Sequence, residues 1–272
     1  MSRRNLAAGL FLAIQISRPL LSEEILVRHS EGVVRGFLAL KALDGTRLAD
    51  GDLIQSSRGD RVTSRLVFRF PDGSIHDETV VFSQRQRFRL VSDHLIQKGP
   101  AFPHPLETSI DAASGRVLVR YLNEPDEKRT DQKMELSADV ANGMMLTLLK
   151  NIRPETPSTS VPMVITSASP RLVKLVKLVI TPSGTDSFSV GRASHKATRY
   201  VVKVEIGGVV GLLAKLLGKV PPDTSVWILQ GEAPAFVKSE GPLYSGGPVW
   251  RIELASPVWA RAPVASPARP TP

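Results

Sequence analysis

Turn dipeptides recur between short alternating runs of apolar and polar residues, and this pattern restricts the fold more than any other feature of the chain. Between Gly32 and Leu136 these dipeptides are Asp44-Gly45, Asp50-Gly51, Asp72-Gly73 and Ser114-Gly115. Such pairs tolerate the positive φ angles that tight hairpin turns require. The pattern therefore predicts successive hairpins and a mainly β, antiparallel fold.

The clearest hairpin is expected around Asp72-Gly73, between residues 62–70 and 75–91. Apolar residues alternate there with arginines, at the period of two that marks a strand with one buried face. The buried face is expected to carry Val62, Leu66, Phe68, Phe70, Val80, Phe82, Phe88 and Leu90. The other face is expected to carry Arg65, Arg69, Arg85, Arg87 and Arg89.

Residues 137–152 interrupt the strand pattern. Val140, Met144 and Leu148 recur at helical spacing, and Ser137 suits an N-cap. We therefore expect one internal amphipathic helix of about three to four turns, which Pro154 would end. Residues 154–162 are rich in proline, serine and threonine, so they are the candidate for a subdomain boundary.

Strand signals resume in the C-terminal half, over residues 198–206, 225–230, 235–238 and 248–254. Trp227 and Trp250 are expected in neighbouring strands, where they could line a cavity or fill the core. Residues 172–181 are apolar but carry lysines three apart, which leaves their type open. Short strands with a single helix favour an antiparallel barrel or sandwich, because both arrangements hide sheet edges.

The N-terminus has the features of a secretory signal peptide. Arg3 and Arg4 precede an apolar run of 11 residues, Leu6–Ile16, which is too short to span a membrane. We expect cleavage after Ser22, with an uncleaved N-terminus as the alternative. The predicted organisation is a signal peptide over residues 1–22, one β domain over 23–257 and a disordered proline-rich tail over 258–272. A periplasmic or secreted location follows.

Composition excludes several function classes. The chain has no cysteine, which rules out disulfides, thiolate catalysis and zinc–thiolate sites. Its net charge of +9 suits anionic envelope polymers or lipid headgroups. Nucleic acid is not an expected partner, since no known nucleic-acid module is present. No segment of the mature chain is expected to span a membrane.

Several segments together resemble a known family. They are FPDGSIHDETVVFSQRQRFRLVSDH, DVANGMMLTLLKNI, GKVPPDTSVWIL and GPLYSGGPVWRIELASP. They resemble exported bacterial proteins of a domain of unknown function, the 3108-type family, over roughly residues 32–257. The resemblance implies a periplasmic, lipocalin-like β protein. It brings no activity and no functional residues.

No catalytic constellation is expected. The five histidines are scattered, and the G-x-S-x-G elbow of many hydrolases does not occur. In a strand, only His76 and Glu78 of the run His76-Asp77-Glu78 would share a face, and two ligands do not make a metal site. No metal or cofactor is therefore predicted. A carboxylate-based hydrolase stays an alternative, because two acids can be brought together by the fold.

Two surfaces are candidate binding sites. The arginine face could bind phosphate or carboxylate groups, or it could be an ordinary solvated sheet face. The glycine-flanked segment 207–219 could dock on lipid or gate a cavity, or it could plug one end of a barrel. Its candidate residues are Val209, Val210, Leu212, Leu213, Leu216 and Leu217.

The first hypothesis is a non-enzymatic carrier of an amphiphilic envelope ligand, such as lipid or lipopolysaccharide-like material, within a β-barrel. The second is an envelope scaffold that binds an anionic partner, an envelope protein among them, through the arginine face. The hydrolase is the third.

Overall fold

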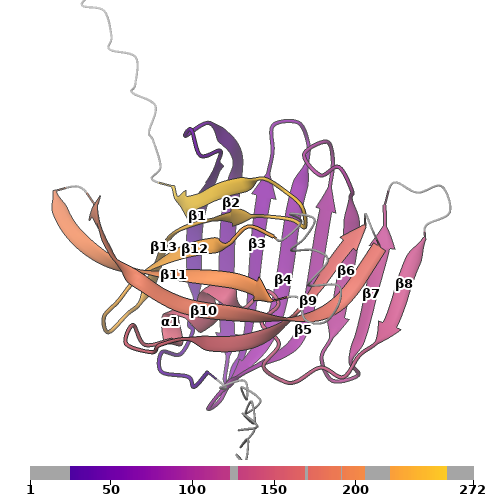
Figure 1. Cartoon of the computed structure of the whole chain (residues 1–272), viewed down its shortest axis with the longest axis horizontal. Coiled ribbons are helices and arrows are strands. Elements are labelled where there is room, and N and C mark those ends of the chain that lie inside the picture. Colours follow the sequence, from indigo (N-terminus) through magenta and orange to yellow (C-terminus); the bar gives the residue numbers. More distant parts are fainter. Residues whose placement is uncertain (1–24, 123–127, 169–170, 191, 206–220, 256–272) are drawn as a thin grey trace, which may run out of the picture.

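The described strands form one antiparallel sheet (Figure 1). The computed structural model describes residues 25–122, 128–168, 171–190, 192–205 and 221–255. The strands are β1 (Val34–Lys41), β2 (Arg47–Arg58), β3 (Arg61–Arg69), β4 (Ile75–Gln84), β5 (Phe88–Lys98), β6 (Leu106–Asp111), β7 (Arg116–Tyr121), β8 (Arg129–Lys133), β9 (Thr159–Ala168), β10 (Arg171–Val190), β11 (Ala193–Glu205), β12 (Thr224–Leu229), β13 (Ala235–Pro242) and β14 (Val249–Leu254). The predicted mainly β, antiparallel class is confirmed.

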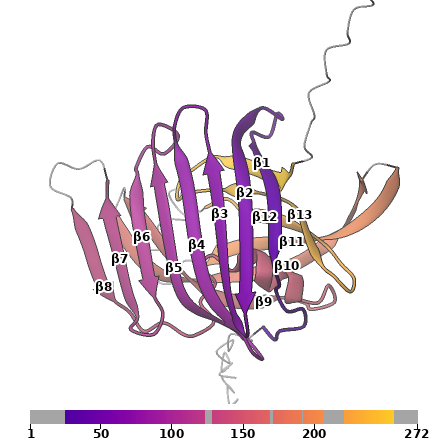
Figure 2. The ribbon, with the colours of Figure 1, turned by 180° about the vertical axis from the view of Figure 1, so that it is seen from behind.

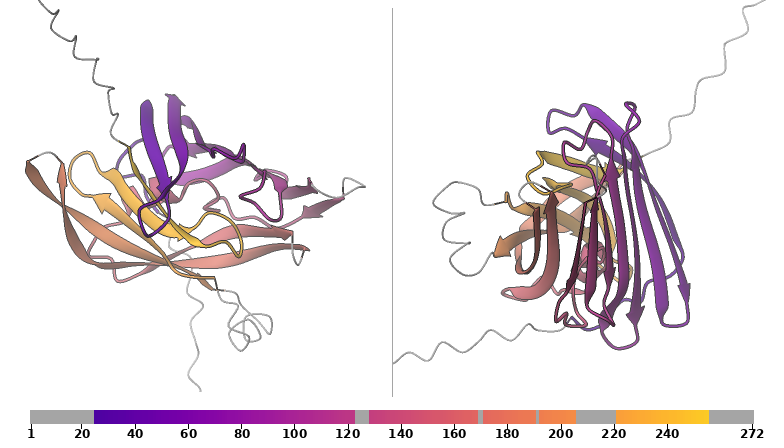
Figure 3. Two further views of the ribbon diagram at one scale, coloured as in Figure 1. Left: turned by 90° about the horizontal axis from the view of Figure 1, so that it is seen from above. Right: turned by 90° about the vertical axis from the view of Figure 1, so that its right-hand side faces the viewer.

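The sheet is open and folds over itself into two layers. Its strand order is β8-β7-β6-β5-β4-β3-β2-β1-β14-β13-β12-β11-β10-β9, so β8 and β9 are the edges. Strands β1 to β8 make one layer, and β9 to β14 cross it in the other (Figures 1 and 3). The β1–β14 pairing, with Leu38 opposite Leu254, joins the layers. The architecture is thus barrel-like without closure of the sheet.

The hairpin predicted at Asp72-Gly73 is present. Gly73 has φ +83°, and β3 and β4 pair from Arg69 opposite Ile75 to Arg61 opposite Ser83. The expectation of one strand over residues 75–91 is wrong, because the chain reverses between Gln84 and Phe88. This turn has no glycine and consists of polar residues that continue the alternating pattern, so its sequence does not differ from that of a strand.

The helix α1 (Met145–Asn151) lies behind the first layer and is visible through it in Figure 2. It is shorter than predicted, and Ser137 is not its N-cap. Gly143 has φ +64°, which a helix does not allow, so the helix begins only after it. The preceding residue, Asn142, is held by β9. Its side-chain amide donates to the Val164 carbonyl and accepts from the Val164 N–H, both at 2.9 Å.

One hydrophobic cluster fills the space between the layers. Met144, Leu148 and Leu149 of the helix region are at most 3% exposed and pack with side chains from both layers. The Tyr200 hydroxyl of β11 donates to the Ile152 carbonyl at 2.7 Å, which ties the second layer to the end of the helix. A smaller cluster around Leu38, Leu40, Ala49 and Phe68 lies where β1 meets β14.

The strands on both sides of residues 154–162 belong to the same sheet, and β9 begins inside this stretch at Thr159. Residues 172–181 are part of the long strand β10, which resolves their open assignment. Trp227 lies in β12 and Trp250 in β14. These strands are separated by β13, so the two tryptophans are not in neighbouring strands as expected.

Candidate anion-binding site

Most arginines on the outer face of the first layer are held by acids on adjacent strands. Arg65 binds Asp77 through two bonds of 2.8 and 2.5 Å, and Arg69 binds Asp52 at 2.7 Å. The Arg65 side chain accordingly lowers the pKa of Asp77 below its ordinary value. Arg116 and Arg120 of β7 are paired with acids in the same way. These four arginines therefore fit the simpler of the two interpretations, in which they belong to an ordinary solvated sheet face.

The arginines are arranged differently at the edge of the first layer that is formed by the β2–β3 turn and the β4–β5 turn. Arg58 lies directly opposite Arg61, Arg61 opposite Ser83, and Ser83 opposite Arg89. Residues directly opposite each other across strands have their side chains on the same face. The four residues therefore form one row across β2, β3, β4 and β5, about 14 Å long at about 4.8 Å per strand. We call this set the arginine row.

The strands position this row through their turns. Gly59 has φ +61°, which allows the two-residue turn that places Arg58 opposite Arg61. The Gln84 backbone N–H donates to the Asp60 carbonyl at 2.8 Å, which fixes the end of β4 against that turn. The buried neighbours Val62, Phe82 and Phe88 face the core, so the arginines of the row are directed outward.

The row is electrostatically unbalanced. Arg58, Arg61 and Arg89 are exposed, and none has an ion-pair partner within the described ranges. Like charges directly opposite one another in a sheet are destabilising. Arg58 and Arg61 are in that position, whereas Arg120, which also has an arginine (Arg129) directly opposite it, is paired with Glu107. An anion bound between Arg58 and Arg61 would remove the repulsion.

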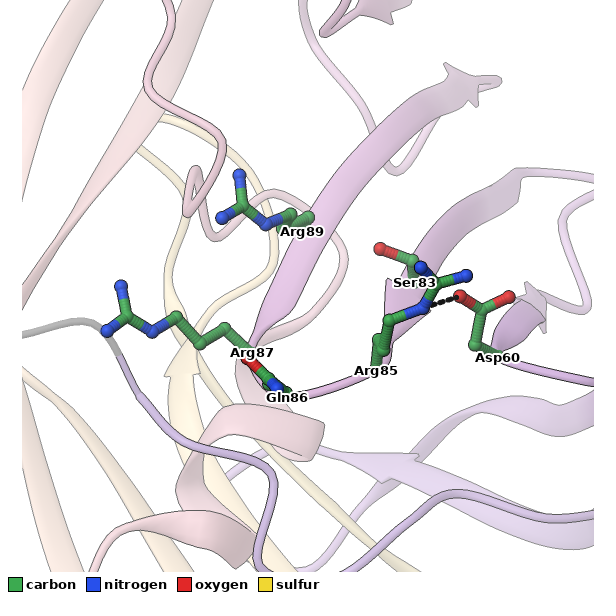
Figure 4. Close-up of a pocket in the computed structure, with 6 residues that line it drawn as sticks. All are labelled: Asp60, Ser83, Arg85, Gln86, Arg87 and Arg89. Carbon is green, nitrogen blue, oxygen red and sulfur yellow. Dashed lines mark hydrogen bonds and ion pairs between the residues drawn. The ribbon is translucent and has the colours of Figure 1, made fainter.

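The turn between β4 and β5 adds two more arginines beside the row. Asp60, Ser83, Arg85, Gln86, Arg87 and Arg89 line an open pocket of about 460 Å³ (Figure 4). Arg85 points to Asp60, with Nε donating to Oδ2 at 3.1 Å, while Arg87 and Arg89 extend to the other side of the turn. Three arginines thus share the pocket with one acid. We call the row and this turn together the arginine site.

The chemistry of the arginine site is that of anion recognition. A guanidinium group presents its N–H donors in a planar fork that binds phosphate or carboxylate oxygens in pairs. The Ser83 hydroxyl lies between Arg61 and Arg89 in the row and can donate a further bond.

Of the predicted face, Arg85, Arg87 and Arg89 are brought together, whereas Arg65 and Arg69 are occupied by acids. Arg58 and Arg61 were not among the predicted residues. Their signal was the Gly59-Asp60 pair, because a two-residue turn there sets the two arginines opposite each other.

A second polar group lies on the inner face of β4 and β5. His76 and Glu78 share that face, as expected, and Asp93 is diagonal to Glu78, since its direct partner is Val80. Burial raises the pKa of Glu78 to about 7. Burial and the charge of Glu78 raise the pKa of Asp93 well above its usual range. Asp93 is 3% exposed, and its Oδ1 has no hydrogen-bond partner among the described residues.

His76 is enclosed near these acids. It is 4% exposed, and burial lowers its pKa to about 4. Gln97 donates from Nε2 to His76 Nδ1 at 3.1 Å and to the Leu243 carbonyl at 2.9 Å. The proton of the neutral imidazole is therefore on Nε2. Within the part of the chain that the structure describes, no three His, Asp or Glu side chains are placed to hold a metal ion.

The two tryptophans pack against protein groups. Trp227 donates from Nε1 to Asp186 at 2.6 Å and lies under the Lys238 ammonium, 4.1 Å from the ring centre. Trp250 packs against Phe70, with ring centres 5.8 Å apart. That either tryptophan lines a ligand cavity stays a prediction. The gating residues Val209, Val210, Leu212, Leu213, Leu216 and Leu217 lie outside the described residues.

Among the described residues, no helix is long and apolar enough to cross a membrane. No family model matches the chain, and no curated protein matches it at a significant level. The 3108-type assignment therefore stays a prediction.

Among solved structures, the chain is similar to a β-barrel-like protein of the domain of unknown function DUF1849 from Brucella abortus. The two are 10% identical, with a TM-score of 0.46, and the match covers 84% of this chain and 98% of the other.

Proposed function

We propose that this protein is a non-enzymatic binding protein that holds an anionic group, phosphate or carboxylate, at the arginine site. The observation that carries the proposal is the row in which Arg58 and Arg61 oppose each other directly without an ion-pair partner in the described ranges. A bound anion would convert this repulsion into charge-assisted hydrogen bonds, which are about twice as strong as neutral ones.

The contrast within the same face supports this function over a general solvated surface. Arg65 binds an aspartate that is diagonal to it in β4, whereas the corresponding diagonal residue for Arg61 is Val81, and the residue directly opposite Arg61 is Ser83. Ser83 is uncharged, so it cannot neutralise Arg61 and Arg89 on its two sides. The chain therefore leaves positive charge in the row beside the pocket and pairs Arg65, Arg69, Arg116 and Arg120 with acids elsewhere on the sheet.

This proposal corresponds to the second hypothesis of the sequence analysis, an anionic partner bound by the arginine face. It restricts the binding surface from the whole face to the arginine site. The carrier hypothesis needs a cavity between the layers, and the described interior there is occupied by α1 and its hydrophobic cluster. Its gating segment lies outside the described residues, so it stays a prediction. The carboxylate-based hydrolase likewise stays a prediction, and neither Glu78 nor Asp93 lines the arginine pocket.

The test is a calorimetric titration with inorganic phosphate. We expect saturable binding by the wild type, and affinity about tenfold lower or more in Arg58→Gln/Arg61→Gln/Arg89→Gln, because each lost bond involves charged groups. The variant removes only exposed side chains, so it is expected to fold.

The matched control is Arg116→Gln/Arg120→Gln. These arginines are also exposed on the outer face, but acids already occupy them. We expect this variant to bind phosphate like the wild type. Equal loss of binding in both variants would mean that phosphate responds to overall charge, and the proposed site would be abandoned.

A further inference from the structure

We propose that the anion recognised at the arginine site is the phosphate of an anionic lipid bilayer, so that this end of the sheet is a membrane-docking surface. The inference rests on the proposed function and adds the identity of the partner. Two observations beyond the arginines point to it: an exposed leucine beside them, and the point at which the N-terminal part of the chain enters the fold.

Leu26 lies beside the arginine turn. It pairs with Arg87 in an antiparallel bridge, and the Val27 backbone N–H donates to the Gln86 carbonyl at 2.9 Å. Residues directly opposite in such a bridge project to the same side. Leu26 is 56% exposed, while Ile25 and Val27 on either side of it pack against the core. The fold therefore exposes the Leu26 side chain next to the arginines of the β4–β5 turn.

The combination of an apolar side chain and arginines matches the chemistry of a bilayer surface. Arginine binds lipid phosphates at the headgroup level, and an exposed leucine can enter the boundary between headgroups and acyl chains. A soluble phosphate or a polysaccharide offers nothing apolar to Leu26. The charges alone would fit any of these partners, and Leu26 favours the bilayer.

The N-terminal part of the chain joins the described fold next to the arginine turn. Ile25, the first described residue, is next to Leu26 and the arginine turn. The apolar run Leu6–Ile16 ends nine residues before Ile25, which is at most about 30 Å of extended chain. In an uncleaved chain, the alternative to cleavage after Ser22, this apolar run is joined in sequence to the fold beside the arginine turn.

The test is vesicle flotation of the full chain. The vesicles contain either phosphatidylcholine alone or phosphatidylcholine with phosphatidylglycerol. We expect binding to the anionic vesicles, reduced about tenfold or more in Arg58→Gln/Arg61→Gln/Arg89→Gln. Leu26→Asn is expected to reduce vesicle binding as well, while its affinity for inorganic phosphate stays that of the wild type, because asparagine adds no charge opposite Arg87. Leu26 is exposed, so this substitution is not expected to disturb the core.

The outcomes separate this inference from the proposed function. Phosphate binding without vesicle binding would overturn the membrane inference and leave the anion site intact. Equal binding to neutral and anionic vesicles, or undiminished binding by either variant, would also overturn it, because the N-terminal run alone would then explain the association. Loss of phosphate binding in the uncharged variant Leu26→Asn would overturn the membrane inference as well, because the leucine would then support the pocket and not contact lipid.

Discussion

Glu78→Gln/Asp93→Asn is expected to gain stability relative to the wild type as the pH rises, by about 3 kcal/mol between pH 4.5 and 8 from Glu78 alone. The pKa of Glu78 is about 7 in the fold, against an ordinary value of 4.5, and each pH unit of difference corresponds to about 1.36 kcal/mol. The stabilisation from the protonated carboxyl is complete below pH 4.5 and is lost as the pH rises through 7. Asp93, whose pKa is also raised, adds to the loss.

The experiment compares the two proteins at each pH, because His76 has the opposite effect. Its pKa is lowered from 6.5 to about 4, so the wild type gains stability from it as the pH rises over that range. Both proteins retain His76, and the difference between their free energies of unfolding cancels it. Urea denaturation at pH 4.5, 6 and 8 measures this difference. A difference that does not change with pH would refute the shared burial of the two acids.

Gly143→Ala is expected to lower the free energy of unfolding by about 3 kcal/mol. The backbone at Gly143 has φ +64°, where a non-glycine residue costs about 1 kcal/mol or more. An alanine Cβ would also lie 2.7 Å from the Cβ of Val80 and 3.1 Å from Asp93 Oδ1. An extra carbon atom in a packed core typically lowers the free energy of unfolding by about 1–3 kcal/mol more.

The matched control for this change is Gly73→Ala in the β3–β4 turn. Gly73 has φ +83°, but nothing lies within 4 Å of the position its Cβ would take. Only the backbone cost remains, so we expect a loss of about 1 kcal/mol. Chemical denaturation of both variants separates the two contributions. If Gly143→Ala costs no more than Gly73→Ala, the segment before α1 is not packed against Val80 as described.

The hairpins were predictable where glycine marks their turns and alternation marks their faces. The Asp72-Gly73 hairpin is the clearest example, with Val62 and Phe82 buried and Arg65 outward. The turn at residues 85–87 was missed because it has no such residue. The helix α1 is shorter than its helical spacing predicts, because Val140 and Met144 at that spacing are buried in a turn, and Gly143 with its positive φ separates this turn from the helix.

The candidate site was predicted in part. Alternation identified Arg85, Arg87 and Arg89, but the same pattern also selected Arg65 and Arg69, which the fold pairs with aspartates. Which arginine meets an acid depends on the register between strands, and alternation within one strand does not specify it. The diagonal approach of Asp93 to Glu78 depends on a register shift between Val81 and Phe82, which no local signal marks.

The central claim is that an anion binds between the opposed arginines. The most direct test compares the melting temperatures of the wild type and Arg61→Glu with and without phosphate. Glutamate at this position would oppose Arg58 as an ion pair, so we expect the variant to be more stable than the wild type in chloride, by about 0.5 kcal/mol. Phosphate at matched ionic strength should raise the melting temperature of the wild type and leave that of Arg61→Glu unchanged. A phosphate shift of equal size in both proteins, or lower stability of Arg61→Glu in chloride, would contradict an anion site built on opposed arginines.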